Sequence, residues 1–465
     1  MQTTKIFLMA ALALMTAACS NDDNDIQTPA EQPAKAQGIP FTATISMGES
    51  ASTRALVEDN VNNKIVATWA TGEKVALIYD AGSTPTKTDA EVTKQADGTA
   101  TISATLASGA TNGSDVTIIY PATAADGTTG NVLANLFAAQ DGTLATIAAN
   151  YDVRKGTGKL SINAGGATVN NGTAGTPVAL TNQNAIFKLT LKDIDGTSDV
   201  SSTSVIISDE NGVVTTVTPA SGYEKAMYVA LPTTATTLKF LVTGSDSKKY
   251  FNMASCLTLS ASYYQSTIKL ATVGHVIASN GKCYKDNLAI PSGESAVAKI
   301  AYLGNDAETS TTNTTFKNGL ALALEDVSGT KTWCSPKGAT CLGTQYDSST
   351  KFNDLAGIYN TDALVNNTGH THAAASAARG YNSGIHPTGT SAWFLPSAGQ
   401  WNKMIGATGL NNLGLTGNAY YWSSTEKDAD RAWIISTFDY EWGKLFGFAK
   451  DDDSSPSRVR ACLAF

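Results

Sequence analysis

The chain has 465 residues, of which 15% are charged, and its 32 Lys and Arg against 40 Asp and Glu give a formal net charge of −8. This acidic balance lacks the excess of positive charge that is typical of nucleic-acid-binding proteins. The length is that of about three domains. The 40 glycines and 16 tyrosines, with abundant Thr, Ala and Asn, favour strands and turns over helices. We therefore expect a mainly β protein.

Residues 1–18 have the pattern of a signal peptide, with one positive charge at Lys5, an apolar run, and small residues at Ala17 and Ala18. The run is too short for a stable membrane span. Because the small residues directly precede Cys19, we predict lipoprotein processing, with Cys19 acylated by chains such as palmitate and anchored in the outer membrane. The alternative is an ordinary secretory signal followed by an incidental cysteine.

Residues 19–38 begin with a cluster of acidic side chains and continue with Gln, Pro, Ala and Glu. Too few apolar residues are present to offset the entropy of ordering, so this segment is predicted to be a disordered tether. Acidic residues directly after the lipidated cysteine also resemble the signal that moves Bacteroidetes lipoproteins to the cell surface.

Short alternating apolar runs continue from Phe41 to about Leu270. In one of them Phe187, Leu189 and Leu191 alternate with polar residues, which predicts a half-buried strand. The regular spacing of such runs favours antiparallel sandwiches. The other expected strands are residues 74–79, 116–120, 227–231, 238–243 and 263–270.

A hairpin is expected where residues 205–207 and 213–217 flank Asp209-Glu210-Asn211-Gly212. Asn211 and Gly212 would supply the two positive φ angles that a tight turn needs.

Two breaks divide the chain, one at residues 151–158 and one at Val273-Gly274, where the composition changes. Six of the seven tryptophans and four of the six cysteines follow the second break. The predicted domains are residues 39–157, 158–273 and 274–465.

The clearest helix start is Ser397, which with Gln400 forms the pattern of a capping box. Trp401, Met404 and Ile405 would then share one apolar face, until Gly406 ends the helix.

Several segments in order resemble the fimbrillin family of Bacteroidetes pilus subunits. They are residues 68–79, Tyr120-Pro121, residues 140–144, Tyr151-Asp152 and residues 184–189. The resemblance implies two tandem transthyretin-like β-sandwich domains and assembly with other pilus subunits by strand exchange.

It also implies cleavage by a trypsin-like protease behind the first strand, here residues 41–46. Arg54, followed by Ala55, is the only arginine in the first hundred residues. A strand removed from a sandwich leaves unpaired amides and open apolar pockets that an incoming strand can fill. The alternative is that Arg54 is a solvated loop residue.

The last domain resembles the α+β C-type lectin-like domains of bacterial surface proteins, including the paralogous modules of Fibrobacter. The motifs are residues 393–397, 421–426, Ala432-Trp433 and 458–462. The resemblance implies that its large apolar residues, Trp393, Leu395, Trp401, Trp422 and Trp433, pack in the core. This chain has Gln400 where related sequences often have Glu.

Five cysteines remain once Cys19 is lipidated. Cys334 and Cys341 bracket a turn-forming loop that a local disulfide would close. Because the lectin-like fold brings its termini together, Cys283 and Cys462 are the second candidate pair, closing a loop of about 180 residues for roughly 5 kcal/mol. Cys256 is then left as a buried free thiol.

Sites for metal-dependent or catalytic chemistry are not expected. The chain lacks the sugar-binding calcium motifs of lectins, and the runs Asp451-Asp452-Asp453 and His370-Thr371-His372 are more typical of solvated loops. Glu426, Asp428 and Asp430 are ambiguous. No nucleophile triad or phosphate-binding glycine motif stands out, so we predict no cofactor and no enzyme.

These features favour an accessory or tip pilus subunit, with loops at about 331–387 and 428–457 presenting a surface to a host or microbial glycan or protein. The runner-up is a surface lipoprotein that binds carbohydrate and never polymerises. A third class is an enzyme of the formylglycine-generating type, which shares the lectin-like fold. That class needs a reactive cysteine pair, whereas Cys334 and Cys341 are expected to form a structural disulfide that closes a loop.

Overall fold

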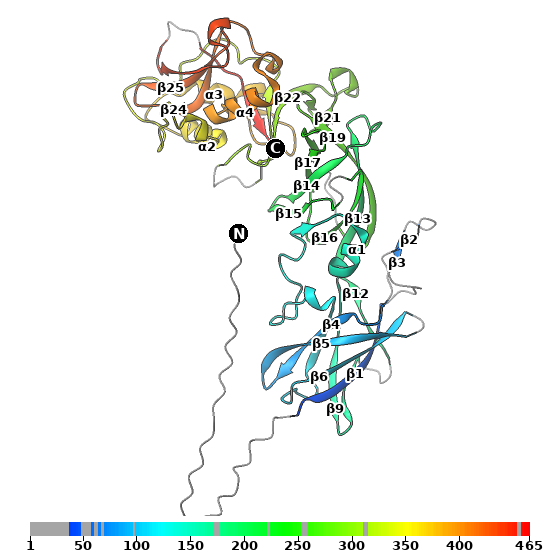
Figure 1. Ribbon diagram of the computed structural model, residues 1–465. Coiled ribbons are helices and arrows are strands. Elements are labelled where there is room, and N and C mark those ends of the chain that lie inside the picture. The colour runs from blue at the N-terminus through cyan, green and yellow to red at the C-terminus, as the bar shows by residue number, and fades with distance from the viewer. Residues whose placement is uncertain are drawn as a thin grey trace, which may run out of the picture.

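The computed structural model is mainly β, and its three parts follow one another along the molecule, with the longer helices in the C-terminal part (Figure 1). Among the described residues, no helix is both long and apolar enough to cross a membrane. The predicted signal peptide and Cys19, Arg54, Ala55 and Cys256 lie outside the described residues. The described ranges are 37–47, 57–59, 64–66, 69–95, 98–171, 176–220, 224–252, 259–309, 315–452 and 457–465.

The first sheet has nine strands and closes on itself, because β1 pairs with β6 on one side and with β10 on the other, and β10 also pairs with β9. A separate hairpin joins β2 (Val57–Asp59) and β3 (Lys64–Val66). The nine strands are β1 (Ile39–Ser46), β4 (Lys74–Ala81), β5 (Thr84–Lys94), β6 (Thr99–Leu106), β7 (Asp115–Tyr120), β9 (Arg154–Asn163), β10 (Gly166–Asn170), β11 (Val178–Ala179) and β12 (Thr181–Asn182).

The predicted boundary between residues 157 and 158 is wrong, because it falls inside β9. This strand pairs with β7 and β10, so the first sheet extends to Asn182. Two glycines of this strand allow close packing, since a Cβ at Gly158 would collide with the side chain of Val169, and one at Gly156 would collide with Leu180.

The second sheet has eight strands. Phe187, Leu189 and Leu191 are at most 2% exposed, which confirms the predicted half-buried strand. The other five strands expected from alternation are also present. The eight strands are β8 (Ala139–Gln140), β13 (Asn184–Asp193), β14 (Ser202–Asp209), β15 (Gly212–Val217), β16 (Ala226–Pro232), β17 (Lys239–Gly244), β18 (Lys249–Asn252) and β19 (Tyr263–Thr272).

The β14–β15 hairpin is confirmed, but its turn differs from the expectation. Asp209 pairs with Gly212, so Glu210 and Asn211 form the turn, and of these residues only Gly212 has a positive φ, at 126°. The Asn211 amide donates to the Asp209 carboxylate at 2.7 Å. This side-chain bond holds the turn without a left-handed Asn.

A segment of the first part reaches into the second. Between β7 and β9 the chain forms the short helix η1 (Ala122–Ala124), strand β8, the helical turn α1 (Leu144–Thr146) and the turn η2 (Ile147–Tyr151). Strand β8 pairs in parallel with β15, at the edge of the second sheet. Residues of both parts share one apolar cluster, in which Ile119 and Ile147 lie with Ile186 and Ala230.

The C-terminal part begins at Val276, just after Gly274, and its described residues form two sheets and three α-helices. Five 3-10 turns connect them: η3 (Asn287–Ala289), η4 (Lys351–Asn353), η5 (Tyr381–Gly384), η6 (Leu410–Leu413) and η7 (Asp439–Glu441). The five-stranded sheet contains β20 (Val276–Ala278), β21 (Cys283–Tyr284), β22 (Ala296–Leu303), β23 (Gly319–Ala323) and β28 (Cys462–Ala464). The four-stranded sheet contains β24 (Tyr420–Glu426), β25 (Arg431–Ser436), β26 (Leu445–Ala449) and β27 (Ser457–Arg458). The α-helices are α2 (Gly357–Val365), α3 (Ala373–Arg379) and α4 (Ala398–Thr408).

Helix α4 begins with the predicted capping box. The Ser397 hydroxyl accepts from the Gln400 amide at 3.3 Å, and the Gln400 side chain accepts from the Ser397 amide at 2.9 Å. The helix continues past Gly406 and is capped by Gly409.

The predicted core role of the large apolar residues in this part is confirmed. None of the five is more than 2% exposed, and each of their four indoles donates its N–H to a backbone carbonyl. They are Trp393, Leu395, Trp401, Trp422 and Trp433.

Candidate functional site

Strand β1 closes the first sheet and buries one of its faces. Phe41, Ala43, Ile45 and Met47 are at most 4% exposed, whereas Thr42 on the other face is exposed. Along its full length the strand pairs with β6, and its other edge meets β10 and β11 in parallel. Each apolar side chain therefore fills a pocket whose walls belong to other strands.

Removing β1 would open the ring between β6 and β10. Backbone groups of β6 would lose their partners, and buried side chains such as Ile102 and Val169 would face solvent. An extended segment with an apolar residue at every second position would restore both kinds of contact.

Residues 462–465 are paired, hydrogen-bonded and buried within the C-terminal part. Strand β28 pairs with β23 on one side and exchanges two hydrogen bonds with Phe394 on the other. Phe465 is buried, its amide and carbonyl are bonded to residues at the start of β23, and its ring lies 4.9 Å from that of Phe251 in the second part. These residues are therefore not free to leave as a donor strand.

The predicted pairing of Cys283 with Cys462 is wrong. Both are free thiols, on β21 and β28 at opposite edges of the five-stranded sheet, with β20, β22 and β23 between them. At about 4.8 Å per strand their separation is roughly 19 Å, far beyond the reach of a disulfide. The domain does bring its ends into one sheet, but not to neighbouring strands.

Cys334 and Cys341 lie close together, with their sulfur atoms 3.4 Å apart, and both are free thiols. Burial raises the pKa of Cys334 and raises that of Cys341 to about 12. The disulfide expected here stays a prediction.

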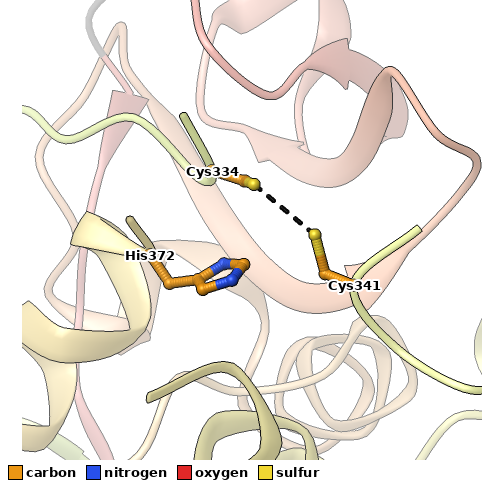
Figure 2. A group of neighbouring side chains, drawn as sticks. All are labelled: Cys334, Cys341 and His372. Atoms are coloured by element: carbon orange, nitrogen blue, oxygen red, sulfur yellow. Dashed lines mark hydrogen bonds between the residues drawn. The ribbon is translucent and has the colours of Figure 1, made fainter. Parts of the chain in front are cut away.

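His372 completes a cluster with these two cysteines (Figure 2). The three potential ligand atoms all lie within 4.8 Å of one another. His372 is 3% exposed, and neither of its ring nitrogens makes a hydrogen bond of ordinary geometry, although the Trp333 backbone is near enough to act on its pKa. Burial lowers the pKa of His372, and the neighbouring His370 lowers it further.

The two histidines of the His370-Thr371-His372 run do not converge on one point. His370 is half-buried, with Nδ1 3.0 Å from the carbonyl oxygen of Pro336. Sequence reasoning treated the run as a loop because no cysteine is nearby along the chain. The fold brings the cysteines to His372 through a two-bond bridge between Ser335 and Thr371.

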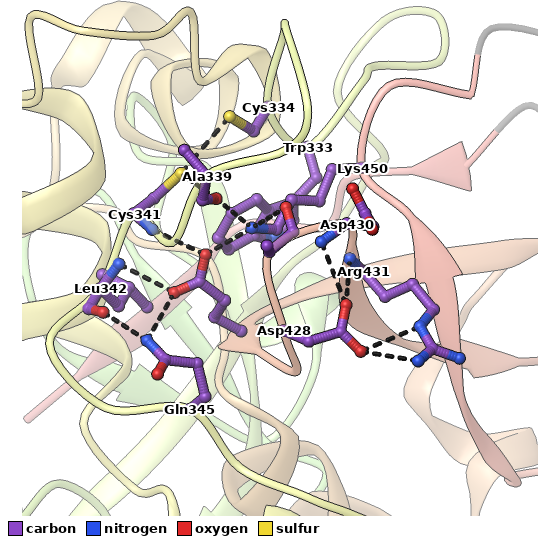
Figure 3. A network of polar contacts seen from close by, with 12 residues as sticks. Trp333, Cys334, Ala339, Cys341, Leu342, Gln345, Asp428, Asp430, Arg431 and Lys450 are labelled. Atoms are coloured by element: carbon purple, nitrogen blue, oxygen red, sulfur yellow. Dashed lines mark hydrogen bonds and ion pairs between the residues drawn. The ribbon is translucent and has the colours of Figure 1, made fainter.

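Glu426 is fully buried beside the cluster and belongs to a network of polar contacts. Its partners Cys341, Leu342, Gln345 and Lys450 are labelled in Figure 3. Its carboxylate accepts from Lys450 Nζ at 2.5 Å and from the amides of Cys341 and Leu342 at 2.7 and 2.9 Å. The Gln345 side chain donates to it at 3.2 Å. Glu426 therefore holds the loop of residues 334–341, here called the cysteine loop, in place. Its role, which the sequence left ambiguous, is structural.

The other acidic candidates face basic partners. Asp428 accepts from Arg431 at 2.9 Å, and Asp451 lies 3.0 Å from Lys337. Asp430 is exposed. These contacts hold surface loops together.

A groove of about 490 Å³ lies between the second and C-terminal parts, lined among others by Phe251, Lys269 and Lys285. It is distant in sequence from the predicted ligand loops. On those loops, Tyr440 is 73% and Trp442 39% exposed. Exposed aromatic rings are common contact points for partners.

No family model matches the chain, and no curated protein matches it significantly. Among solved structures, a fimbrial protein from Bacteroides ovatus is 14% identical, with 92% of this chain and 99% of that chain covered and a TM-score of 0.33. A "putative cell adhesion protein" from Bacteroides ovatus is 13% identical, with 51% of this chain and 95% of that chain covered and a TM-score of 0.30. One from Bacteroides uniformis is 12% identical, with 52% and 94% covered and a TM-score of 0.28. Because these TM-scores are low, we infer the function from the geometry described above.

Proposed function

We propose that the chain is an adhesive subunit of a cell-surface fibre that assembles by strand exchange. In this proposal it reaches the outer membrane with a lipid on Cys19, and a trypsin-like protease then cuts after Arg54. The observation that carries the proposal is the position of β1, which closes the first sheet and directly precedes the segment containing Arg54.

A cut at this point turns β1 from a part of the chain into a separate peptide, still joined to the lipid. Only hydrogen bonds and apolar contacts then hold it in place. Burial of a side chain as large as Phe41 or Ile45 is worth about 1.5–3 kcal/mol, and an equivalent strand from a neighbour would recover the same amount. Exchange would therefore cost little at equilibrium and would release the subunit from the membrane.

The C-terminal part suits the end of a fibre. Because Cys462 to Phe465 are bonded within their own sheet, they are not available to a neighbour. The loops at about 331–387 and 428–457 would then be presented to a glycan or protein ligand.

The test of assembly uses the full chain and a biotinylated peptide of residues 39–47. After limited trypsin treatment, we expect N-terminal sequencing to show Ala55 and the peptide to be incorporated. Arg54→Gln should block both. A peptide with Ile45→Asp should fail to bind, whereas Thr42→Asp, on the exposed face, should bind.

The runner-up, a lipoprotein that never polymerises, predicts the opposite result. Surface material would keep the acylated Cys19 and residues before Ala55, and the cut chain would not take up the peptide.

The test of ligand binding applies the full chain to glycan and extracellular-matrix arrays, with and without calcium. Tyr440→Ser should reduce any binding that uses the proposed loops. The matched control is Val213→Ser, which removes an exposed apolar side chain from the second part. Equal effects of the two variants would show that binding does not use the loop around Tyr440.

A further inference from the structure

We propose that Cys334, Cys341 and His372 form a binding site for one Zn²⁺ ion, with a fourth coordination position left to water. The site is independent of fibre assembly, because it lies in the C-terminal part and shares no residue with β1.

The spacing of the ligand atoms suits a metal better than it suits a bond between the sulfurs. Two thiolates at about 2.3 Å from a tetrahedral zinc lie roughly 3.8 Å apart, whereas bonded sulfurs lie about 2.05 Å apart. The Sγ atoms of Cys334 and Cys341 are 3.4 Å apart. With His372 they face a common point (Figure 2).

His372 provides the second, separate observation. A buried ring neither of whose nitrogens makes a hydrogen bond of ordinary geometry carries an unfavourable desolvation cost that proteins normally avoid. A metal ion bound to one nitrogen supplies the missing interaction. The Trp333 ring packs edge-on against the imidazole, with centroids 5.9 Å apart, and limits its rotation.

The backbone holds all three ligands in place before any ion arrives. Ser335 and Thr371 exchange two hydrogen bonds of 2.9 Å, which fix the residues next to Cys334 and His372 relative to each other. The amide of Cys341 is held by Glu426 at 2.7 Å. Outer contacts of this kind orient metal ligands and are often as important as the ligands.

Charge balance favours a divalent ion. The neighbouring Glu426 and Lys450 already neutralise each other. When zinc binds, each cysteine releases its thiol proton to solvent, so two negative sulfurs meet two positive charges and the site is neutral. A monovalent ion such as Cu⁺ would leave one net negative charge buried. Two sulfurs and an imidazole are also ligands that zinc prefers.

The test titrates the purified, reduced full chain with Zn²⁺, and with Co²⁺ as a spectroscopic substitute. We expect one equivalent to bind, with the intense visible bands of tetrahedral cobalt and a thiolate charge-transfer band. Cys341→Ser and His372→Gln should each weaken binding by more than the roughly 10- to 100-fold that loss of an outer contact costs. The control is Cys283→Ser, which removes a cysteine outside the cluster and should bind as the unmodified chain does.

A second measurement needs no variant and so does not depend on whether variants fold. Zinc binding should release two protons per ion, one from each thiol, as measured by calorimetry in buffers of different ionisation enthalpy. The proposal is wrong if fewer than two protons are released per ion, or if Cys341→Ser and His372→Gln bind zinc as tightly as Cys283→Ser.

Discussion

The carboxylate of Glu426 and the ammonium of Lys450 form an ion pair from which solvent is excluded, since neither side chain has any exposed surface. Lys450 also donates to the carbonyls of Ala339 and Ala429 at 2.9 and 3.0 Å, and it lies over the ring of Trp333. The pair therefore joins the cysteine loop to the β25–β26 side of the domain.

Replacing Lys450 with Met should lower the free energy of unfolding of the C-terminal part by about 3–5 kcal/mol, because Glu426 would keep a buried charge without a cation. Urea unfolding followed by tryptophan fluorescence measures this, since six of the seven tryptophans lie in this part. The control is Lys337→Ala, which breaks the partly exposed pair with Asp451 and should cost about 0–1 kcal/mol. Similar losses for both variants would contradict a dominant role for the buried pair.

Two glycines of helix α4 should respond in opposite directions to alanine. At Gly399 a Cβ would collide with the carbonyl oxygens of Asp354 and Phe352, so Gly399→Ala should destabilise by about 1–3 kcal/mol. At Gly406 a Cβ would meet nothing within 4 Å, so Gly406→Ala should stabilise by about 0.5–1 kcal/mol. Thermal unfolding of both variants checks this, and the same sign for both would refute it.

The side chain of Gln140 links the first two parts by forming the two hydrogen bonds that a neighbouring strand would form with Ala230. Its side chain accepts from the Ala230 amide at 2.8 Å and donates to the Ala230 carbonyl at 2.7 Å. Gln140→Ala should cost about 1–3 kcal/mol for each buried group left without a partner and should speed hydrogen exchange at Ala230. Gln183→Ala is the control, because that side chain bonds only to Thr181 and Asn182, and unchanged exchange in both variants would count against the proposed link.

Glu73 should make stability depend on pH. The pKa of Glu73 is raised from 4.5 to about 7, chiefly by burial, with the bond from the Ala70 amide acting against the shift and the charge of Asp152 adding to it. Because the folded state holds this proton more tightly than the unfolded state, its contribution is complete below pH 4.5 and is lost as pH rises through about 7.

The urea midpoint of the first part, followed at Trp69, should therefore fall between pH 5 and pH 8, and Glu73→Gln should reduce that fall. Glu91→Gln, which removes a charge from an exposed site on β5, should leave the fall unchanged. A pH profile of Glu73→Gln identical to that of the unmodified chain would rule out this assignment.

Local patterns predicted local structure well. The capping box at Ser397 and the alternation around Leu189 depend on residues a few positions apart, so the sequence contains the whole signal. The turn of the β14–β15 hairpin lies one residue earlier than predicted, at Glu210 and Asn211. The bond from the Asn211 amide to the Asp209 carboxylate holds it, so Asn211 does not need a left-handed conformation.

Long-range features were not readable in the same way. The pairing of Cys283 with Cys462 failed because strand order, which no local pattern encodes, places them at opposite edges of a sheet. The cluster at His372 was missed because it depends on the bridge from Thr371 to Ser335. The boundary between residues 157 and 158 failed because β9 pairs with β7 and β10, and such pairing between strands is not visible in the local pattern.

Strand β8 leaves the first sheet's part of the chain and completes the edge of the second. A tensile load between these parts is carried by the direct chain connection and by hydrogen bonds around β8. The Thr216 and Thr218 amides donate to the carbonyls of Ala138 and Gln140, and the Gln140 side chain donates to the Ala230 carbonyl. These bonds must break together before the parts can separate. Separation of the two parts under pulling therefore requires these hydrogen bonds to break, which the chain connection alone would not demand.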